Sequence, residues 1–525
     1  MLALLALLLV AGFLCPLYAD EIAYRMQHSR LFLDHGRGFT LFPQCFPADW
    51  ELAVSPLSYP YRALESLVYN AAETPLIVRT FGILKALVLL ALSFRVFGLL
   101  ASRTGEPRGA AAAALAGGAY GIGVAPWVLV INRPEQEILL AVFFTAWLLL
   151  RERRGSGLAA TAGFLVALLF ALATHPNALF FLPLWAFAAL ALPRARSARL
   201  GSLAAVVAFS FDRVVTTAES LLCPRDPETL AQLRAMTLSP RDLFGDPISF
   251  VAAAAGNLAH LPDYARSLFF AGVYSYGWAP FHPMTPVHVA ANVLVALVVA
   301  ALALAALAGL ALSLAKAREA DRGTWIGWCV ALAWAGIVVT QQRKFWYNVM
   351  LITPPLTLMA AAFWPALAAR ARFLRAAGTA AVAATFASLL VFAWSFVGEA
   401  PPVLRAPGAN LVGGISFSGF GYAEVTAKLR ETAALCGIDA DHPPRRLGVD
   451  ALTYWAFRRG EEPIDVSYLS GVYVRSSSYA SVIGSLDAFL KERGSSGIVA
   501  RCNQVADPAL RERGKAHGQF CCWTF

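Results

Sequence analysis

Apolar residues are grouped along this chain in runs long enough to cross a lipid bilayer, with polar connectors between them. A helix that crosses the hydrocarbon core needs about 17–25 residues. The pattern predicts spans at 1–18, 76–101, 109–131, 136–150, 158–174, 178–193, 200–218, 287–315, 324–341, 347–368 and 374–397. The run at 136–150 is short and needs residues from its flanks. We therefore expect a polytopic α-helical membrane protein with about eleven spans.

Two of the connectors are too long to be simple turns. In the first, about 19–75, residues 21–36 and 59–73 alternate apolar and polar positions with helical spacing, and Leu64, Leu67 and Val68 share one side. Such amphipathic helices typically lie in the membrane interface. The second long connector, about 219–286, ends in an aromatic-rich amphipathic stretch.

The pattern changes after Gly398, where "GEAPPVLRAPGANLVGG" has the composition of a linker. Beyond it we expect helices at 422–437, 450–460 and 478–494, and strands at 445–450, 463–470, 496–503 and 518–525. Helices and strands alternating at this spacing predict a small α/β domain. The expected organisation is a transmembrane catalytic domain at 1–397 and a C-terminal extracytoplasmic domain at 398–525.

Composition and charge agree with the membrane interpretation. The chain has 525 residues, 58% of them hydrophobic and 14% charged, more apolar surface than a soluble fold of this size can bury. The net charge of +10 comes from clusters in alternate connectors, which the positive-inside rule assigns to the cytoplasm. These clusters are Arg103 and Arg108; Arg151, Arg153 and Arg154; Arg194, Arg196 and Arg199; Lys316, Arg318 and Arg322; and Arg370, Arg372 and Arg375.

This distribution predicts a multi-pass protein of the inner (plasma) membrane, with a cytoplasmic N-terminus and a periplasmic or extracellular C-terminal domain. It excludes nucleic acid as the partner that explains the basic charge. The first run lacks a basic n-region, so we expect a retained span there, with a cleaved signal peptide as the alternative.

The eight cysteines divide by predicted compartment. Two lie in spans, and an oxidising exterior would allow disulfides among the other six, although the sequence does not assign partners. The six are Cys45, Cys223, Cys436, Cys502, Cys521 and Cys522.

Asp20 and Glu21 follow the first span at the outer membrane boundary. A carboxylate that is partly desolvated there has the properties of a general base. Equally, acids at this position favour the N-terminus of a helix through its dipole. The two interpretations follow from the same placement, so both stay open at this point.

Two short outer turns carry further candidates. In "INRPEQEILL", Pro134, Glu135 and Glu137 suit the start of a helix, but Arg133 places a cation where short outer connectors usually have none. In "ATHPNALFF", His175 lies at the lip of the next outer turn. A lone histidine in a turn is more often structural than catalytic, and its shared face with Asp20 and Arg133 favours function.

A third outer turn, "TQQRKFWYNVMLITPP", places Arg343 and Lys344 beside Trp346 and Tyr347. Cations beside an aromatic belt can be snorkelling side chains. Guanidinium and ammonium groups also bind phosphate, and at the outer leaflet this indicates a lipid phosphate. Histidines and acids elsewhere in the outer loops have no spacing diagnostic of a metal, so no cofactor is predicted and a divalent metal stays open.

In order and spacing, these pieces resemble the GT-C membrane glycosyltransferases, in particular the branch of the protein O-mannosyltransferases and lipid A aminoarabinose transferases. The resemblance covers about residues 10–370. It is carried by "DEIAY", "SPLSYPYRALESLVYN" with "VRTFGILKAL", "NRPEQEILL", "THPNALFF" and "QQRKFWYNVMLITPPLTL". "SPLSY" departs from the more common Pro-Pro-Leu-Tyr type of run, and the histidines of the first loop match no family pattern.

The resemblance implies inverting transfer of a sugar from a polyprenyl-phosphate-linked donor to a lipid, glycan or protein acceptor. Asp20 would be the base, and Glu21 would orient it or share its role. Arg343 and Lys344 would stabilise the departing lipid phosphate, with Arg133, His175 and Tyr347 as helpers. The C-terminal domain would hold acceptor or substrate.

Two other classes compete with a transferase. A transporter or flippase of a lipid-linked saccharide would place polar residues or Gly/Pro breaks at the middle of several spans. The spans here are rich in Ala and Leu in their middles, with polar groups at their outer ends, which favours surface chemistry. A scaffold anchored by its membrane part needs far fewer spans than this pattern predicts.

Overall fold

The structure is a computed structural model that describes most of the chain. The residues outside the description are 15–20, 22–24, 27, 40–50, 72–75, 106–107, 152–156, 223–237, 239, 271–283, 342–345, 369–371, 406–410, 413–414, 417–421, 451–452, 458–463, 467–484, 493 and 506. The remainder forms two compact units. One comprises Met1–Gly12, Phe81–Val215 and Met236–Glu399, and the other Phe13–Thr80, Thr216–Ala235 and Ala400–Phe525.

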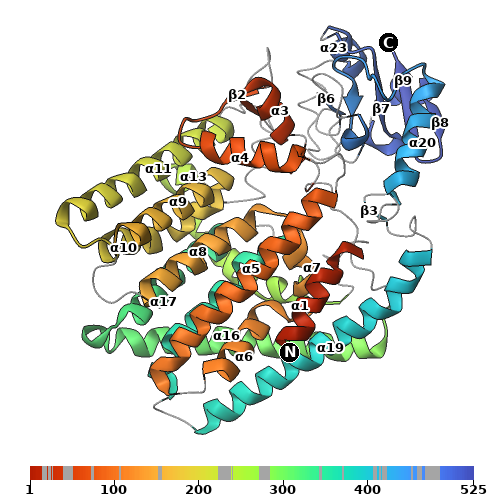
Figure 1. Cartoon of the computed structure of the whole chain (residues 1–525). Coiled ribbons are helices and arrows are strands. Elements are labelled where there is room, and N and C mark those ends of the chain that lie inside the picture. Colours follow the sequence, from red (N-terminus) through yellow and green to blue (C-terminus); the bar gives the residue numbers. More distant parts are fainter. Residues whose placement is uncertain are drawn as a thin grey trace. The chain divides into compact units, whose positions relative to one another are not determined.

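The first unit is helical (Figure 1). Its helices are α1 (Leu2–Ala11), α5 (Leu76–Ala101, which begins in the second unit), α6 (Arg108–Tyr120), α7 (Ala125–Val130), α8 (Pro134–Arg151), α9 (Leu158–Thr174), α10 (Leu182–Ala191), α11 (Arg196–Leu222, which ends in the second unit), α13 (Pro240–Gly245), α14 (Pro247–Ala259), α15 (Pro262–Arg266), α16 (Pro286–Leu314), α17 (Arg322–Thr340), α18 (Thr353–Ala368) and α19 (Arg372–Arg405, which also ends in the second unit). Short 3-10 helices include η4 (Ser102–Thr104), η5 (Pro176–Phe181), η6 (Ala317–Glu319) and η7 (Trp346–Leu351).

The described part of every predicted apolar run falls mainly on one helix or on two consecutive helices. Within the described residues, six helices are long and apolar enough to cross a membrane: Leu76–Thr104, Arg196–Ala218, Pro286–Leu314, Arg322–Thr340, Val349–Leu367 and Gly378–Gly398. Others, such as Leu158–Thr174, are apolar but shorter. The helical membrane part is thus confirmed, while the count of about eleven spans stays a prediction.

Small residues let the central helices approach closely. The ring of Phe363 on α18 is buried against Gly309 of α16 and Gly327 of α17. A Cβ atom at either glycine would come within 2.6 Å of Phe363. Because lipid tails are as apolar as leucine, such close packing is a main source of helix association in a membrane. The three helices are therefore joined around one aromatic side chain.

The run predicted as one span at 109–131 is broken. Helix α6 ends at Tyr120 and α7 begins at Ala125, with Gly123 between them at a positive φ of 53°. The Gly123 N–H donates to Ser388 Oγ at 2.8 Å, and the Val124 N–H donates to the Leu268 carbonyl at 3.0 Å. The backbone N–H and C=O groups of a non-helical segment inside a membrane protein need hydrogen-bond partners from nearby in space. Here the partners come from segments that are distant in sequence.

We expect Gly123→Ala to destabilise the protein and Gly118→Ala, on α6, to serve as its matched control. A Cβ at Gly123 would lie 2.0 Å from the Leu268 carbonyl oxygen, and the left-handed conformation alone costs a non-glycine residue about 1–2 kcal/mol. At Gly118 no atom lies within 4 Å of an added Cβ, and alanine is favoured inside a helix by about 0.5–1 kcal/mol. Thermal unfolding in detergent measures both, and equal shifts would contradict this account of the break.

The second unit contains the described part of the first long connector. Helix α3 (His28–His35) leads into strand β1 (Arg37–Phe39), which pairs antiparallel with β2 (Glu51–Ala53), and α4 (Tyr59–Asn70) follows. Phe32 and Tyr59 stack edge to face with ring centroids 5.0 Å apart. The two amphipathic helices predicted from the sequence are therefore present and packed on each other.

The same unit contains a mixed five-stranded sheet near the C-terminus, in the order β6-β5-β7-β9-β8. Strand β5 (Gly448–Val449) is parallel to β6 (Ile464–Asp465) and to β7 (Gly497–Arg501); β9 (Phe520–Thr524) is antiparallel to β7 and to β8 (Lys515–His517). Also present are β3 (Leu411–Val412), β4 (Ile415–Ser416), α20 (Tyr422–Leu435), η9 (Tyr454–Ala456), α23 (Leu486–Glu492) and α24 (Pro508–Arg513). The expected small α/β fold is confirmed, and the boundary at 398 stays a prediction.

Two disulfides among the described residues pair four of the six outer cysteines; Cys45 and Cys223 lie outside the described residues. Cys436 at the end of α20 pairs with Cys522, and Cys502 pairs with Cys521. Neighbouring residues of a strand point to opposite faces of its sheet. Adjacent cysteines in β9 therefore bind partners on opposite sides, and Cys521 faces the apolar cluster that contains Leu486 and Leu490 of α23.

Candidate functional site

Glu21 forms a buried ion pair. Its side chain is 0% exposed, and its Oε2 lies 2.7 Å from Nη2 of Arg79, which is 1% exposed and belongs to the first turn of α5. Removing both charges from water is costly, and a close partner is what offsets that cost. Glu21 is thus bound by a guanidinium inside the protein. Asp20 lies outside the described residues.

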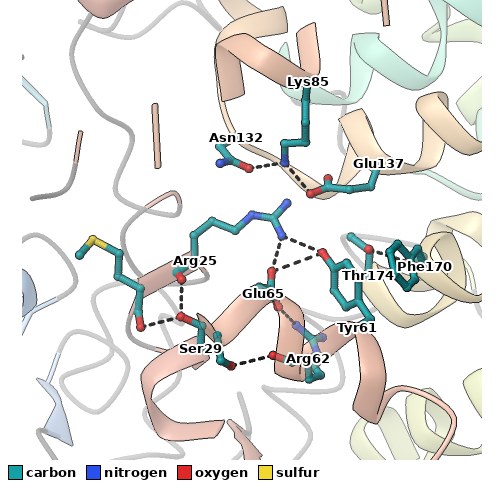
Figure 2. A network of polar contacts seen from close by, with 12 residues as sticks. Arg25, Ser29, Tyr61, Arg62, Glu65, Lys85, Asn132, Glu137, Phe170 and Thr174 are labelled. Atoms are coloured by element: carbon teal, nitrogen blue, oxygen red, sulfur yellow. Dashed lines mark hydrogen bonds and ion pairs between the residues drawn. The ribbon is translucent and has the colours of Figure 1, made fainter. Parts of the chain in front are cut away.

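A second buried network joins the first connector's helices (Figure 2). Arg25 contacts Glu65 as an ion pair and donates to the Tyr61 hydroxyl at 3.1 Å, while Arg62 donates to the other Glu65 oxygen at 2.7 Å. Burial acts to raise the pKa of Glu65, but the Arg62 and Arg25 guanidiniums outweigh it and hold that pKa below its usual value. Glu65 is therefore kept ionised as a structural anchor.

This network places the polar side of α4 inside the protein. Its buried residues include Glu65 and Ser66, whereas Leu64 and Leu67 are 48% and 62% exposed. An amphipathic helix with its polar side inward and its leucines outward is suited to a membrane interface. The predicted shared side of Leu64 and Leu67 is confirmed; the interfacial location stays a prediction.

A third polar group lies in the first unit, around the turn between α7 and α8 (Figure 2). Lys85 of α5 donates to Asn132 Oδ1 and to Glu137 Oε1, each at 2.5 Å. Gln136 donates to the backbone carbonyl of Gly82 at 2.9 Å. The "INRPEQE" turn is therefore fastened to α5 by two side chains, and one contact is an ion pair that lies largely out of water.

Arg133, a predicted phosphate helper, lies in the same turn. It is buried, and its Nε is 3.4 Å from Oε2 of buried Glu135. Pro134 is the first residue of α8, as its sequence position predicted. The acids of this turn have ion-pair partners, Arg133 for Glu135 and Lys85 for Glu137, so the helix dipole is not their only reason to be here.

His175, the other predicted helper, caps a helix. Its Nδ1 accepts the Asn177 backbone N–H at 3.1 Å, at the start of η5. This is the structural role that the sequence alternative described. The role of His175 in phosphate binding stays a prediction.

The remaining phosphate candidates fall at the edge of the description. Arg343 and Lys344 lie outside the described residues, and Tyr347 belongs to the 3-10 helix η7 by its backbone. The chain just before them is held firmly: Gln341 accepts from the Tyr264 hydroxyl at 3.2 Å, and the Thr340 carbonyl accepts from the Leu238 N–H at 2.8 Å. The convergence of Asp20, Arg133, His175 and Lys344 that the sequence predicts stays a prediction.

Arg79, Lys85 and Asn132 were not singled out from the sequence. Both cations lie on α5, inside the apolar span predicted at 76–101. The signal was present, because an ionisable residue within a membrane helix is rare and usually faces a partner inside the protein. What the sequence did not supply was the partner of each cation.

No group of three or more His, Cys, Asp or Glu side chains suited to a metal occurs in the described part of the chain. In the second long connector, Asp263 Oδ2 lies 3.1 Å from His260 Nδ1, and Asp263 Oδ1 lies 2.8 Å from Arg266 Nη1. That carboxylate is engaged by two cationic or basic groups on its own short segment, which is an ordinary surface arrangement.

No protein-family model and no curated protein matches this sequence. Two solved structures that match are oligosaccharyltransferases of Archaeoglobus fulgidus. One, tethered by a disulfide to an acceptor peptide containing the NVT sequon, has a TM-score of 0.41 and 11% identity over 96% of this chain and 69% of that chain. The other, AglB with an inhibitory peptide and a dolichol-phosphate, has a TM-score of 0.40 and 11% identity over 100% and 74%.

With TM-scores of 0.41 and 0.40 and 11% identity, these two matches assign neither a family nor a residue role to this chain. The function of this chain is therefore argued from its own residues.

Proposed function

We propose that this chain is an integral-membrane glycosyltransferase. It transfers a sugar from a polyprenyl-phosphate-linked donor to a lipid, glycan or protein acceptor on the periplasmic face of the inner membrane. The transfer inverts the anomeric centre, and Asp20 is the general base. The support is the resemblance to GT-C enzymes together with the chemistry of the first outer connector.

The observation that carries the proposal is the buried Glu21–Arg79 pair, one residue after Asp20. Glu21 is fully buried and bound to its own guanidinium, so its side chain is poorly placed to reach an acceptor hydroxyl. We therefore assign proton transfer to Asp20 and orientation to Glu21. A buried charge pair at this position is costly to keep, and function is a common reason for retaining one in a membrane protein.

In the proposed reaction the acceptor hydroxyl oxygen bonds to the anomeric carbon from the face opposite the phosphate. The bond between that carbon and the phosphate oxygen breaks, and its electron pair stays on the polyprenyl phosphate. The acceptor's proton passes to the Asp20 carboxylate. Arg343 and Lys344 stabilise the negative charge on the departing phosphate, with Arg133, His175 and Tyr347 proposed as helpers.

A lipid-linked saccharide transporter is the second candidate, and the break between α6 and α7 favours it. Discontinuous helices line the binding sites of many transporters. Here, however, Gly123 and Val124 donate to Ser388 and Leu268, and the neighbouring residues are buried in protein. A packed break of this kind satisfies the backbone without a translocation path, so the transferase is the preferred function.

The full chain in lipid nanodiscs, supplied with polyprenyl-phosphate sugars and a mixture of lipid, glycan and peptide acceptors, tests the proposal. We expect sugar to leave the donor and to appear on an acceptor with inverted configuration. A parallel reaction with a chelator, then with added Mg²⁺ or Mn²⁺, determines metal dependence. Movement of intact donor across proteoliposomes without cleavage would favour transport and contradict the transferase.

A further inference from the structure

An apolar strip on α13 and α14 faces away from the protein. Phe244 of α13 is 85% exposed, and Ile248 and Val251 of α14 are 84% and 62% exposed, with Leu258 also exposed. On a soluble protein, large apolar side chains gathered in this way would mark a partner or an aggregation surface. This chain, however, has six helices long and apolar enough to span a membrane among its described residues.

The opposite side of α14 is attached to a spanning helix. Successive residues of an α-helix are rotated by about 100°, so Asn257, nine positions after Ile248, points to the opposite side. Asn257 is buried, and its Nδ2 donates to the Val339 carbonyl of α17 at 2.7 Å. The contact with α17 and the exposed apolar strip therefore occupy opposite sides of α14.

The depth of this segment is set by the last turn of α17. Leu238, two residues before α13, donates to the Thr340 carbonyl at 2.8 Å, and Asn257 near the end of α14 binds Val339. The 13 residues of α14 extend about 20 Å, short of the roughly 30 Å hydrocarbon core. The segment cannot cross the bilayer, so it stays at the bilayer face where α17 ends.

We propose that Pro240–Ala259 is an interfacial anchor whose apolar strip, Phe244, Ile248, Val251 and Leu258, is embedded in the lipid leaflet beside the carboxyl end of α17. The spanning helix α17 has an exposed apolar side chain of its own, Leu332, in its middle. Lipid therefore already meets the helix to which α14 is fastened. Apolar side chains at the headgroup boundary hold such helices in place.

The anchor has a consequence for the outer turn that follows α17. Asn257 within the anchor donates to Val339, and Leu238 just before it donates to Thr340. Gln341 accepts from Tyr264, just beyond α14. The end of α17 is thus tied to the level of the lipid headgroups. This inference concerns membrane contact alone and does not depend on the proposed transferase activity.

Site-specific photocrosslinking in the full chain tests the anchor. p-Benzoylphenylalanine is placed singly at Phe244 and at Ile248, the protein is reconstituted in nanodiscs of phosphatidylethanolamine and phosphatidylglycerol, and adducts are identified by mass spectrometry after irradiation. Leu304, exposed on α16, is the lipid-facing control, and exposed His442 of the C-terminal part is the water-facing control.

We expect lipid adducts at 244 and 248, as at 304, and no lipid adducts at 442. Both test positions are exposed, so neither substitution removes a packed side chain, and two independent positions guard against a local folding defect. Absence of lipid adducts at 244 and 248, or crosslinks there to a second copy of the chain or to another protein, would overturn the anchor.

Discussion

We expect the Asp20→Asn variant to transfer sugar about 10²–10⁴-fold more slowly than the wild type, the range associated with loss of a general base. Asparagine has nearly the shape of aspartate but does not take up the proton of the acceptor hydroxyl. The acceptor oxygen would then attack the anomeric carbon while it still carries its proton. A protonated hydroxyl is a poor nucleophile. The rate is measured as sugar released from the polyprenyl-phosphate donor at saturating donor and acceptor.

Two matched variants separate the base from other effects of charge. Glu21→Gln is expected to lower transfer less than Asp20→Asn, because Glu21 is paired with Arg79 and is proposed to orient its neighbour. Asp439→Asn, at an exposed carboxylate near the C-terminal sheet, is expected to leave the rate unchanged. Wild-type turnover by Asp20→Asn, at equal thermal stability, would remove Asp20 as the base.

The helical elements followed from the sequence because the bilayer leaves little choice. A long apolar run in lipid must satisfy its own backbone groups, and an α-helix does so within the segment. The described part of each predicted run accordingly lies mainly on helices. The break at Gly123 escaped prediction because its partners, Ser388 and Leu268, lie far along the chain. A local pattern contains no information about a distant hydroxyl or carbonyl that can replace a helical hydrogen bond.

Periodicity also gave the existence of α4 but not the environment of its two sides. In water, Leu64 and Leu67 would be buried and Glu65 exposed, whereas the structure has the reverse. The reason is Arg25, a cation from another segment that reaches Glu65 inside the protein. The same limit applies to the cysteines: a strand places Cys521 and Cys522 on opposite faces, but only the fold brings Cys502 to one face and Cys436 to the other.

For the candidate site, the sequence identified turns better than it identified partners. The sequence predicts a turn at "INRPEQE", and the structure has one there, but the residue that binds it, Lys85, lies inside an apolar run. Arg79 was missed in the same way, although it is the partner of Glu21. An ionisable residue within a membrane span costs free energy unless it has a partner, so such residues are the strongest sequence indication of buried ion pairs.

Arg79→Met is expected to destabilise the protein by about 3–5 kcal/mol, because it leaves the carboxylate of Glu21 buried without its Arg79 partner. The double variant Glu21→Gln, Arg79→Met should recover much of that loss, since an uncharged side chain costs less to bury than a carboxylate. Chemical unfolding of the wild type, both single variants and the double variant in one detergent gives the coupling energy of the pair. Arg430→Met is the matched control, because the Arg430–Asp441 pair is exposed at a similar distance of 2.8 Å and should contribute little. Equal losses for Arg79→Met and Arg430→Met, or a double variant no more stable than Arg79→Met, would show that burial of the Glu21 charge does not govern this part of the fold.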